Sequence, residues 1–268
     1  MRIISVGHAV FAATLIALGL ASLITGHFAA IWQPVSQGIH GRKALIYLCA
    51  FVPLACGMGV LWRPAAATAA RVLFVYLLLW MVLFKVPYIL RAPTVEVNYQ
   101  SCGETAVLVA GAWVLYASCA GGWDRRWLRF AVGERGVHAA RALFALALIA
   151  FGLSHFAYLD LTAPLVPRWL PAPVVWAYFT GSAYLAAGLA VLSGLWDRLA
   201  AALSALQMGL FTVLVWVPII ASGVATAGQR VEFVVSWALT AAAWVVADSY
   251  GGTPWFAFGG HWRPVTRS

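Results

Sequence analysis

The sequence predicts an all-α, polytopic membrane protein with eight transmembrane helices, arranged as two parallel four-helix-bundle repeats. The first reason is composition: 63% of the 268 residues are hydrophobic and 9% are charged, with a mean hydropathy of +0.89, whereas a soluble domain carries about 25% charged residues. The second is that the apolar runs are long and continuous rather than alternating, which favours helices over a β-barrel. The third is an internal repeat.

Apolar runs between charged or Pro/Gly-rich breaks predict the individual spans. They cover residues 3–25, 44–62, 67–90, 105–120, 139–159, 174–195, 199–222 and 233–249. The first run follows Arg2 as a cleaved signal peptide would, but it is longer than the apolar part of such a peptide, so we expect it to be retained. Pro87 and Pro218 lie near the ends of the third and seventh spans, where each either kinks or ends its helix.

The net charge of +9 predicts an orientation rather than a nucleic-acid partner, because cytoplasmic loops of membrane proteins collect Lys and Arg. The predicted loops place eleven basic residues on one side: Arg2, Arg63, Arg71, Arg125, Arg126, Arg129, Arg135, Arg141, Arg198, Arg263 and Arg267. Fewer lie on the other side: Arg42, Lys43, Arg91, Arg168 and Arg230, with Lys85 just inside the membrane. We therefore expect a multi-pass membrane protein with both termini in the cytoplasm.

The two halves of the chain repeat one another at an offset of 131 residues. The matched residues include Tyr47 with Tyr178, Gly57 with Gly188, Val86-Pro87 with Val217-Pro218, and Ala112-Trp113-Val114 with Ala243-Trp244-Val245. A shift of three residues aligns His27 with His155. Proline, tryptophan and tyrosine matches in one register are not expected from chance similarity of apolar sequences.

The repeat predicts four regions: a first membrane unit (1–122), a cytoplasmic linker (123–138), a second membrane unit (139–250) and a cytoplasmic tail (251–268). Four helices is an even number, so both units have the same orientation and are related by an axis along the membrane normal. The linker carries Trp123, Trp127, Leu128 and Phe130 among arginines, a pattern compatible with an interfacial helix. Several tryptophans, Trp32 among them, fall at predicted interfaces and are typical of aromatic belts.

Residues 141–217 resemble the DoxX-like family of four-helix bacterial membrane proteins. The resemblance rests on Gly152-Leu153-Ser154-His155-Phe156, Val166-Pro167-Arg168-Trp169-Leu170-Pro171, Tyr178-Phe179-Thr180-Gly181 and Ala186-Ala187-Gly188-Leu189-Ala190. The first half keeps His27, Tyr47 and Gly57 but has Gln33-Pro34-Val35-Ser36-Gln37 in place of the connector. The resemblance implies a four-helix unit and a link to redox membrane proteins, since the family takes its name from a small subunit of a thiosulfate:quinone oxidoreductase.

Ionisable residues within apolar spans are candidate functional residues, because they are costly to bury in a bilayer. His27, His155, Lys85 and Glu104 are predicted at a similar depth near the outer interface, with Tyr47 and Tyr178 on the same side. Trp216 stands where the first unit has Lys85, so a site built here would be asymmetric. None of the four cysteines forms a C-x-x-C pair, and only Cys102 is expected in a loop outside the membrane.

Three alternatives stay open for the histidine pair and two for the pair of Lys85 and Glu104. Facing imidazoles of His27 and His155 would hydrogen-bond the carbonyls of a quinone or ligate a haem or metal, or each would only bond its own unit. The chain has no C-x-x-C-H haem attachment motif, so a quinone is favoured over haem and no metal site is predicted. Lys85 and Glu104 would form either an ion pair that fixes helix packing or part of a head-group pocket.

The polar residues near the outer interface, together with the DoxX-like resemblance, thus predict a protein of the bacterial inner membrane that binds a quinone or similar hydrophobic small molecule near the outer leaflet. It would serve as a subunit or partner of an electron-transfer or redox-stress system, in contact with the lipid bilayer and with redox partner proteins. The alternatives are a transporter or lipid-handling protein that uses the cleft between the units, and a scaffold that docks partners on its linker. Phosphate loops, nucleophile elbows and paired intramembrane carboxylates are all missing from the sequence, which gives no support to NTP hydrolysis, acyl transfer or glycosyl chemistry.

Overall fold

The structure is a computed structural model that describes residues 5–32, 35 and 38–258. Within these residues it contains helices and no strand, and eight segments are long and apolar enough to cross a membrane. They are α1 (Val6–Thr25), α2 (Arg42–Leu61), α3 to α4 (Ala66–Arg91), α5 (Glu96–Cys119), α7 (Gly133–Ala157), α9 (Pro173–Ser193), α10 to α11 (Asp197–Ala221) and α12 (Ala227–Asp248). The predicted fold class, an all-α polytopic membrane protein with eight spans, is confirmed.

Shorter helices connect these spans. They are η1 (Ala30–Trp32), α6 (Gly122–Trp127), α8 (Leu159–Thr162) and η3 (Ala163–Leu165). Local sequence explains several helix ends: Ser5 caps α1 by accepting a hydrogen bond from the His8 amide, and Gly26 ends it with φ at 65°. Thr226 and Gln229 form a capping box at the start of α12.

The predicted start of the fourth span was wrong. The helix begins at Glu96 rather than at residue 105, so Cys102 lies within α5 and not in a loop. The first turns of α5 carry polar residues, so hydropathy does not predict them as part of the span. They are stabilised by hydrogen bonds: the side-chain amide of Asn98 donates to the carbonyl oxygens of Tyr88 and Ala92. Helices α7 and α12 likewise begin several residues before the predicted spans, at Gly133 and Ala227.

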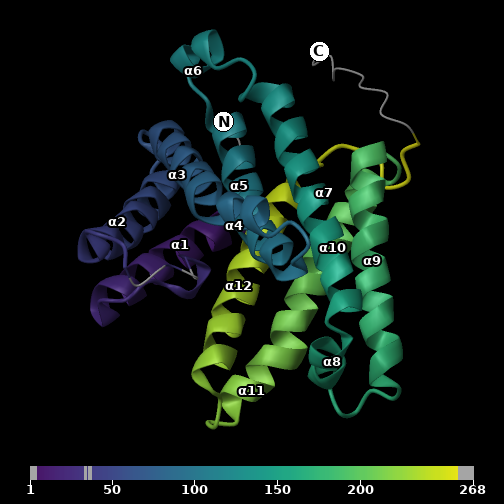
Figure 1. Ribbon diagram of the computed structural model, residues 1–268. Helices are drawn as coiled ribbons and strands as arrows, with labels where there is room; N and C mark the ends of the chain where they lie inside the picture. Colours follow the sequence, from purple (N-terminus) through teal and green to yellow (C-terminus); the bar gives the residue numbers. More distant parts are fainter. Residues whose placement is uncertain (1–4, 33–34, 36–37, 259–268) are drawn as a thin grey trace.

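Helices α5 and α12 form the centre of the molecule (Figure 1). We call α1 to α5 the first unit and α7 to α12 the second unit. The first helix of each unit packs against the last helix of the other, α7 along α5 and α1 along α12, and α5 also packs on α12. The two repeats therefore share their central helices and are not separate bundles. The predicted boundaries of regions 1–122, 123–138, 139–250 and 251–268 stay predictions.

A π-helical turn interrupts the same span of each unit. The first turn, η2 (Met81–Lys85), joins α3 (Ala66–Trp80) to α4 (Val86–Arg91), and the second, η4 (Thr212–Trp216), joins α10 (Asp197–Phe211) to α11 (Val217–Ala221). The two turns are 131 positions apart, and a proline follows each as the second residue. Proline has no N–H and cannot continue the α-helical hydrogen-bond pattern. In the residue before each proline, the N–H bonds a carbonyl five positions earlier: Val86 N–H bonds Met81 O, and Val217 N–H bonds Thr212 O.

Glycines allow the same close helix packing in both units. A Cβ on Gly57 of α2 would meet the carbonyl oxygen of Ala12 at 2.7 Å, and a Cβ on Gly188 of α9 would meet that of Ala145 at 2.8 Å. At the centre, Gly111 of α5 lies against Ala242 of α12, and these residues are again 131 positions apart. Small residues let helices approach closely in a membrane, and here they hold the two units in equivalent geometries.

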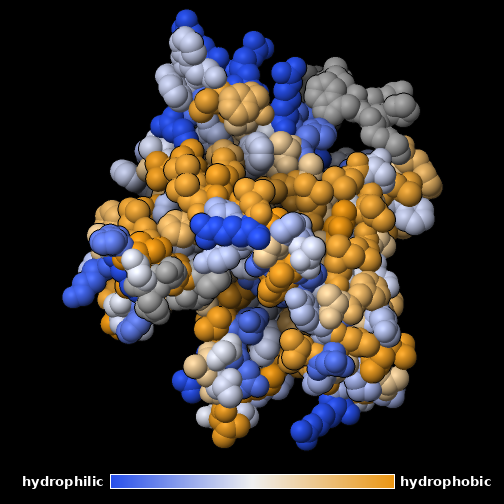
Figure 2. Space-filling view, viewed as in Figure 1, coloured by the Kyte–Doolittle hydropathy of each residue, from blue (hydrophilic) through white to orange (hydrophobic). Residues whose placement is uncertain are grey.

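The outer surface is hydrophobic over its middle. Figure 2 shows hydrophobic side chains between a hydrophilic end, over α6, and hydrophilic tips opposite. Large apolar side chains are exposed on this belt, including Phe51 (63% exposed), Leu83 (61%) and Leu189 (60%). A soluble monomer rarely exposes contiguous apolar surface on this scale, so the belt fits contact with lipid. We call the end at α6, with Arg71, Arg125 and Arg198, the arginine-rich end.

Candidate functional site

The structure does not bring the two predicted histidines together. His27, after α1, is exposed, and its Nδ1 lies 2.6 Å from the carbonyl oxygen of Thr25. His155, near the end of α7, is partly buried, with Nδ1 2.8 Å from Phe151 O and its ring 5.6 Å from that of Tyr184. Although α1 packs on α12 and α7 packs on α5, the contacts given above for each imidazole are with residues of its own unit.

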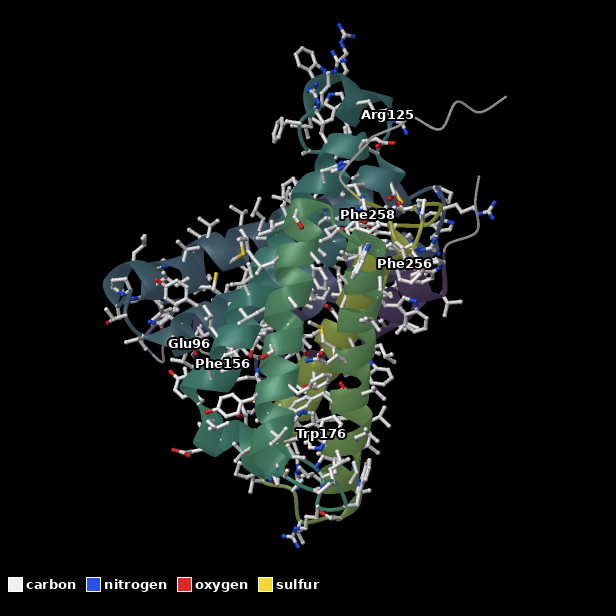
Figure 3. The ribbon with its side chains drawn as sticks, turned by 90° about the vertical axis from the view of Figure 1, so that its right-hand side faces the viewer. Glu96, Arg125, Phe156, Trp176, Phe256 and Phe258 are labelled. Atoms are coloured by element: carbon white, nitrogen blue, oxygen red, sulfur yellow. The ribbon has the colours of Figure 1, made fainter. Side chains whose placement is uncertain are left out.

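The two predicted tyrosines lie on the outer surface. Tyr47 is 56% exposed and Tyr178 is 44% exposed. The Tyr178 ring lies 5.6 Å from that of Phe156, which Figure 3 shows at the side of the bundle near Glu96. Glu96 begins α5 and accepts a hydrogen bond of 2.5 Å from Ser154 of α7, so this contact ties the two units together. The tyrosines themselves face the surroundings rather than an enclosed site.

Lys85 is held inside the first unit. It is 2% exposed at the end of the π turn, and its Nζ donates to Ser101 Oγ of α5 at 2.9 Å. Glu104, one helical turn after Ser101, lies within electrostatic range of Lys85 and of Glu232 on α12. The structure thus groups Lys85 and Glu104 in one polar region between a π turn and the central helices.

Trp216 occupies the equivalent place in the second unit. Its side chain is 4% exposed and lies edge-on to Phe211 at 5.8 Å. Its indole N–H has no hydrogen-bond partner among the described residues. Both π turns therefore direct the side chain at their last position into the protein. In the first unit this side chain is the hydrogen-bonded ammonium group of Lys85, and in the second unit it is the indole ring of Trp216.

An aromatic group that the sequence did not predict lies in the first unit. Trp32 of η1 packs against Tyr76 and Trp80 of α3, with ring centroids 5.3 Å and 5.1 Å away. Phe84 stacks on Trp80 at 4.2 Å. We call Trp32, Tyr76 and Trp80 the tryptophan cluster. The prediction that Trp32 belongs to an interfacial belt was wrong. Its side chain is 0% exposed, because it packs against α3 of the first unit and η1 packs against α12 of the second.

The tryptophan cluster contains buried donors without acceptors. Within the described residues, the indole N–H groups of Trp32 and Trp80 have no hydrogen-bond partner. The Tyr76 hydroxyl faces the thiol of Cys49, which is a weak hydrogen-bonding group. A buried polar group without a partner is costly in an apolar environment. The cluster is therefore suited to a molecule that brings hydrogen-bond acceptors to it.

The π turn also connects this cluster to Lys85. In a regular α-helix, the side chains of residues five positions apart point in widely different directions. A π turn, whose hydrogen bond joins residues five positions apart, brings such side chains towards the same face of the helix. Trp80 and Lys85 are five positions apart across the turn. The sequence signal that could have revealed the site is therefore Tyr76, Trp80 and Lys85 followed by Pro87.

At the arginine-rich end, Asp124 of α6 anchors the linker to the first unit. Arg71 Nη1 donates to it at 3.0 Å, the Tyr116 hydroxyl at 2.9 Å and the Gly121 amide at 3.1 Å. Burial alone would raise the pKa of Asp124, but these hydrogen bonds and the Arg71 charge outweigh it and hold the pKa below its ordinary value. The arrangement is a satisfied structural network without an open position for a ligand.

Other kinds of site find no support in the described part of the chain. No group of three or more His, Cys, Asp or Glu residues is placed to hold a metal ion among the residues described. The four cysteines are free thiols, and Cys49 and Cys56 are buried. Comparisons of the chain with protein families, with curated proteins and with solved structures each found no match. The resemblance to the DoxX-like family therefore stays a prediction.

Proposed function

We propose that this multi-pass membrane protein binds a hydrophobic small molecule with a planar, carbonyl-bearing head group at the tryptophan cluster. The observation that carries the proposal is the pair of buried indole N–H groups, on Trp32 and Trp80, that lack acceptors among the described residues. A molecule with carbonyl oxygens would satisfy these donors and remove the cost of burying them. Its ring would take the place of Phe84, which stacks on Trp80 at 4.2 Å between ring centroids, and would pack against the indole face.

A quinone is the ligand class that fits this chemistry best. Its head group is planar and apolar on both faces, and its carbonyl oxygens accept hydrogen bonds at the ring edge. Lys85 ends the π turn that follows Trp80, and its Nζ donates to Ser101 Oγ. A head group that reached this pair would also meet an ammonium and a hydroxyl. A hydrophobic tail would leave towards lipid along the apolar surface of α3, where Leu79 is 52% exposed.

The site would lie in the outer half of the membrane. Basic residues accumulate on the cytoplasmic side of membrane proteins, so the arginine-rich end and both termini would be cytoplasmic. Tyr76 and Trp80 of the cluster lie after the midpoint of α3 and Lys85 lies beyond its end, away from the arginine-rich end. With the DoxX-like resemblance, this supports a role in the bacterial inner membrane as a partner of an electron-transfer or redox-stress system.

The test is the binding of a short-chain ubiquinone analogue to the purified protein in nanodiscs, measured by equilibrium dialysis. Trp32→Phe and Trp80→Phe keep the rings and remove the N–H groups, so each should weaken binding about tenfold through loss of a hydrogen bond. Trp62→Phe, which alters a tryptophan that is 66% exposed, is the matched control and should leave the affinity unchanged.

Two further measurements separate this site from the histidine hypothesis. His27→Ala and His155→Ala should bind the analogue as the wild type does, because neither imidazole contacts the cluster. A wild-type protein that does not bind the analogue contradicts the proposal, as does binding that both Trp→Phe variants leave intact. Binding that depends on the histidines instead would move the site to the ends of α1 and α7.

A further inference from the structure

A groove in the second unit lies between α10 and α12 at the arginine-rich end. Its volume is about 470 Å³, within the range of roughly 300–1,000 Å³ that is typical of ligand sites. Small residues of α10, namely Ala202, Ala205 and Gly209, form one wall, and Thr240, Trp244 and Ala247 of α12 form the other. We call this cavity the α10/α12 groove.

The repeat supplies the same place in the first unit for comparison. At the offset of 131, Ala205 corresponds to Phe74, Gly209 to Leu78 and Ala247 to Tyr116. Phe74 packs against Trp113 at 4.9 Å and stacks on Tyr116 at 5.7 Å, and both Phe74 and Tyr116 are buried. The first unit therefore fills with its own side chains the volume that the second unit leaves open.

The equivalent tryptophans Trp113 and Trp244 also differ in how closely they are packed. Trp113 is partly buried and donates its indole N–H to the carbonyl of Ala131 in the linker at 2.9 Å. Its equivalent Trp244 is 40% exposed along the groove. Leu206, another lining residue, is 55% exposed, so the groove reaches the apolar surface of the protein. Because protein interiors are packed at nearly crystalline density, lipid chains would fill a surface groove of this size in a membrane.

The mouth of the groove carries one charge of each sign. Arg198 lies with its guanidinium 4.0 Å from the centroid of the Trp255 ring, and its Nη1 donates to the carbonyl of Thr253. Asp248 accepts a hydrogen bond of 2.6 Å from Ser5. Both Arg198 and Asp248 line the groove. A cation and an anion together complement a head group that carries a phosphate and an ammonium.

We propose that the α10/α12 groove binds a zwitterionic glycerophospholipid of the phosphatidylethanolamine type. The acyl chains lie along the small residues of α10 and α12, the phosphate faces Arg198 and the ammonium faces Asp248. The site is in the other unit from the tryptophan cluster and towards the opposite end of the membrane, so it does not depend on the proposed function.

The test uses the full-length protein in nanodiscs that contain phosphatidylethanolamine with a photoreactive acyl chain, followed by mass-spectrometric mapping of labelled residues. Label should concentrate on 202–209 and 240–247, and the equivalent stretches 71–78 and 109–116 of the first unit provide the internal reference. Ala205→Phe combined with Gly209→Leu introduces the first unit's side chains and should lower groove labelling about tenfold relative to wild type.

Two further variants show whether a loss of labelling comes from a filled groove or from misfolding of the protein. Leu206→Val also introduces the first unit's residue into the lining but keeps it aliphatic, and it should label as the wild type does. Ala247→Tyr fills the groove from the α12 side. If the α10 double variant does not fold, this variant tests whether filling the groove lowers labelling. Equal labelling of both units, or labelling that persists in either closed variant, overturns the proposal.

Two arms address the head group and a competing occupant. Unlabelled phosphatidylethanolamine should compete about tenfold better than phosphatidylglycerol, and Arg198→Gln should abolish this preference while groove labelling continues. Equal competition by the two lipids in the wild type overturns the assignment to a zwitterion. Removal of residues 259–268 should leave labelling unchanged, whereas a severalfold increase would identify that segment as the occupant and contradict lipid binding.

Discussion

The two units share a backbone plan and differ in what fills each end. Both have a π turn at the same register, a glycine contact between their first two spans, and a central helix that packs on the other unit. At the arginine-rich end, the first unit is closed by Phe74, Tyr116 and the Asp124 network, whereas the second holds an open groove. At the opposite end, the first unit carries the buried Lys85 and the second carries Trp216.

The comparison shows how one scaffold can offer two different environments. The shared helices α5 and α12 fix the geometry, so a change of side chain at one register position changes one unit without moving the other. Phe74 against Ala205 and Lys85 against Trp216 are such changes. We interpret the duplication as a fold kept constant by its glycine contacts, with each unit free to diverge at the positions that line its interior.

The largest effect is expected where the units are alike. Gly57→Leu and Gly188→Leu each force a side chain against the backbone of the preceding span, and each should destabilise the protein by about 3 kcal/mol or more. Thermal unfolding of the purified variants should show the same loss for both. A large loss for one glycine and a small loss for the other would break the equivalence of the units.

An intermediate effect is expected where only the first unit is closed. Asp124→Asn removes the charge that bonds Arg71, Tyr116 and Gly121 and should cost roughly 2 kcal/mol. The pKa of Asp124 is lower in the folded state than its ordinary value of about 3.9. Its contribution is therefore fully present above that value and is lost as the pH falls through the folded pKa.

Asp160→Asn is the matched control for this prediction, since Asp160 is an exposed aspartate at the other end of the molecule. Unfolding measured between pH 3 and pH 7 should show a difference between wild type and Asp124→Asn that disappears at the acid end. A difference that is independent of pH would mean that the carboxylate charge does not anchor the linker.

The smallest effect is expected at the second π turn. Trp216→Phe removes an indole N–H that has no partner among the described residues, so it should be neutral or stabilise the protein by about 1 kcal/mol at most. The measurement is again the thermal midpoint, with Trp237→Phe as control because the Trp237 N–H does bond Thr14 Oγ1 at 3.1 Å. A loss of 2 kcal/mol or more for Trp216→Phe would reveal a partner at that position.

The sequence was sufficient for the fold class, the eight spans and the repeat register, because these depend on composition, apolar run length and spacing. It was not sufficient for the start of α5, since the polar residues around Asn98 are stabilised by contacts that hydropathy does not register. The exchange of first helices between the units was also missed, because helix packing in a membrane depends on small-residue contacts rather than on apolar content.

The candidate site was predicted in part. Lys85 and Glu104 do lie in one region, whereas His27 and His155 stay in separate units and the tyrosines face outward. Trp32 was placed at an interface because nothing in a three-residue helical turn indicates that it folds back against α12. The α10/α12 groove was not predicted, although Phe74 against Ala205 and Tyr116 against Ala247 were already readable in the repeat.

The central claim is that equivalent places in the two units are closed in one and occupied by lipid in the other. A cryo-electron microscopy map of the full-length protein in nanodiscs of native lipid tests it most directly. The account predicts elongated density between α10 and α12 that ends at Arg198, and only side-chain density around Phe74 and Tyr116 at the equivalent place. Density of equal strength at both places, or a groove closed by the protein itself, would contradict it.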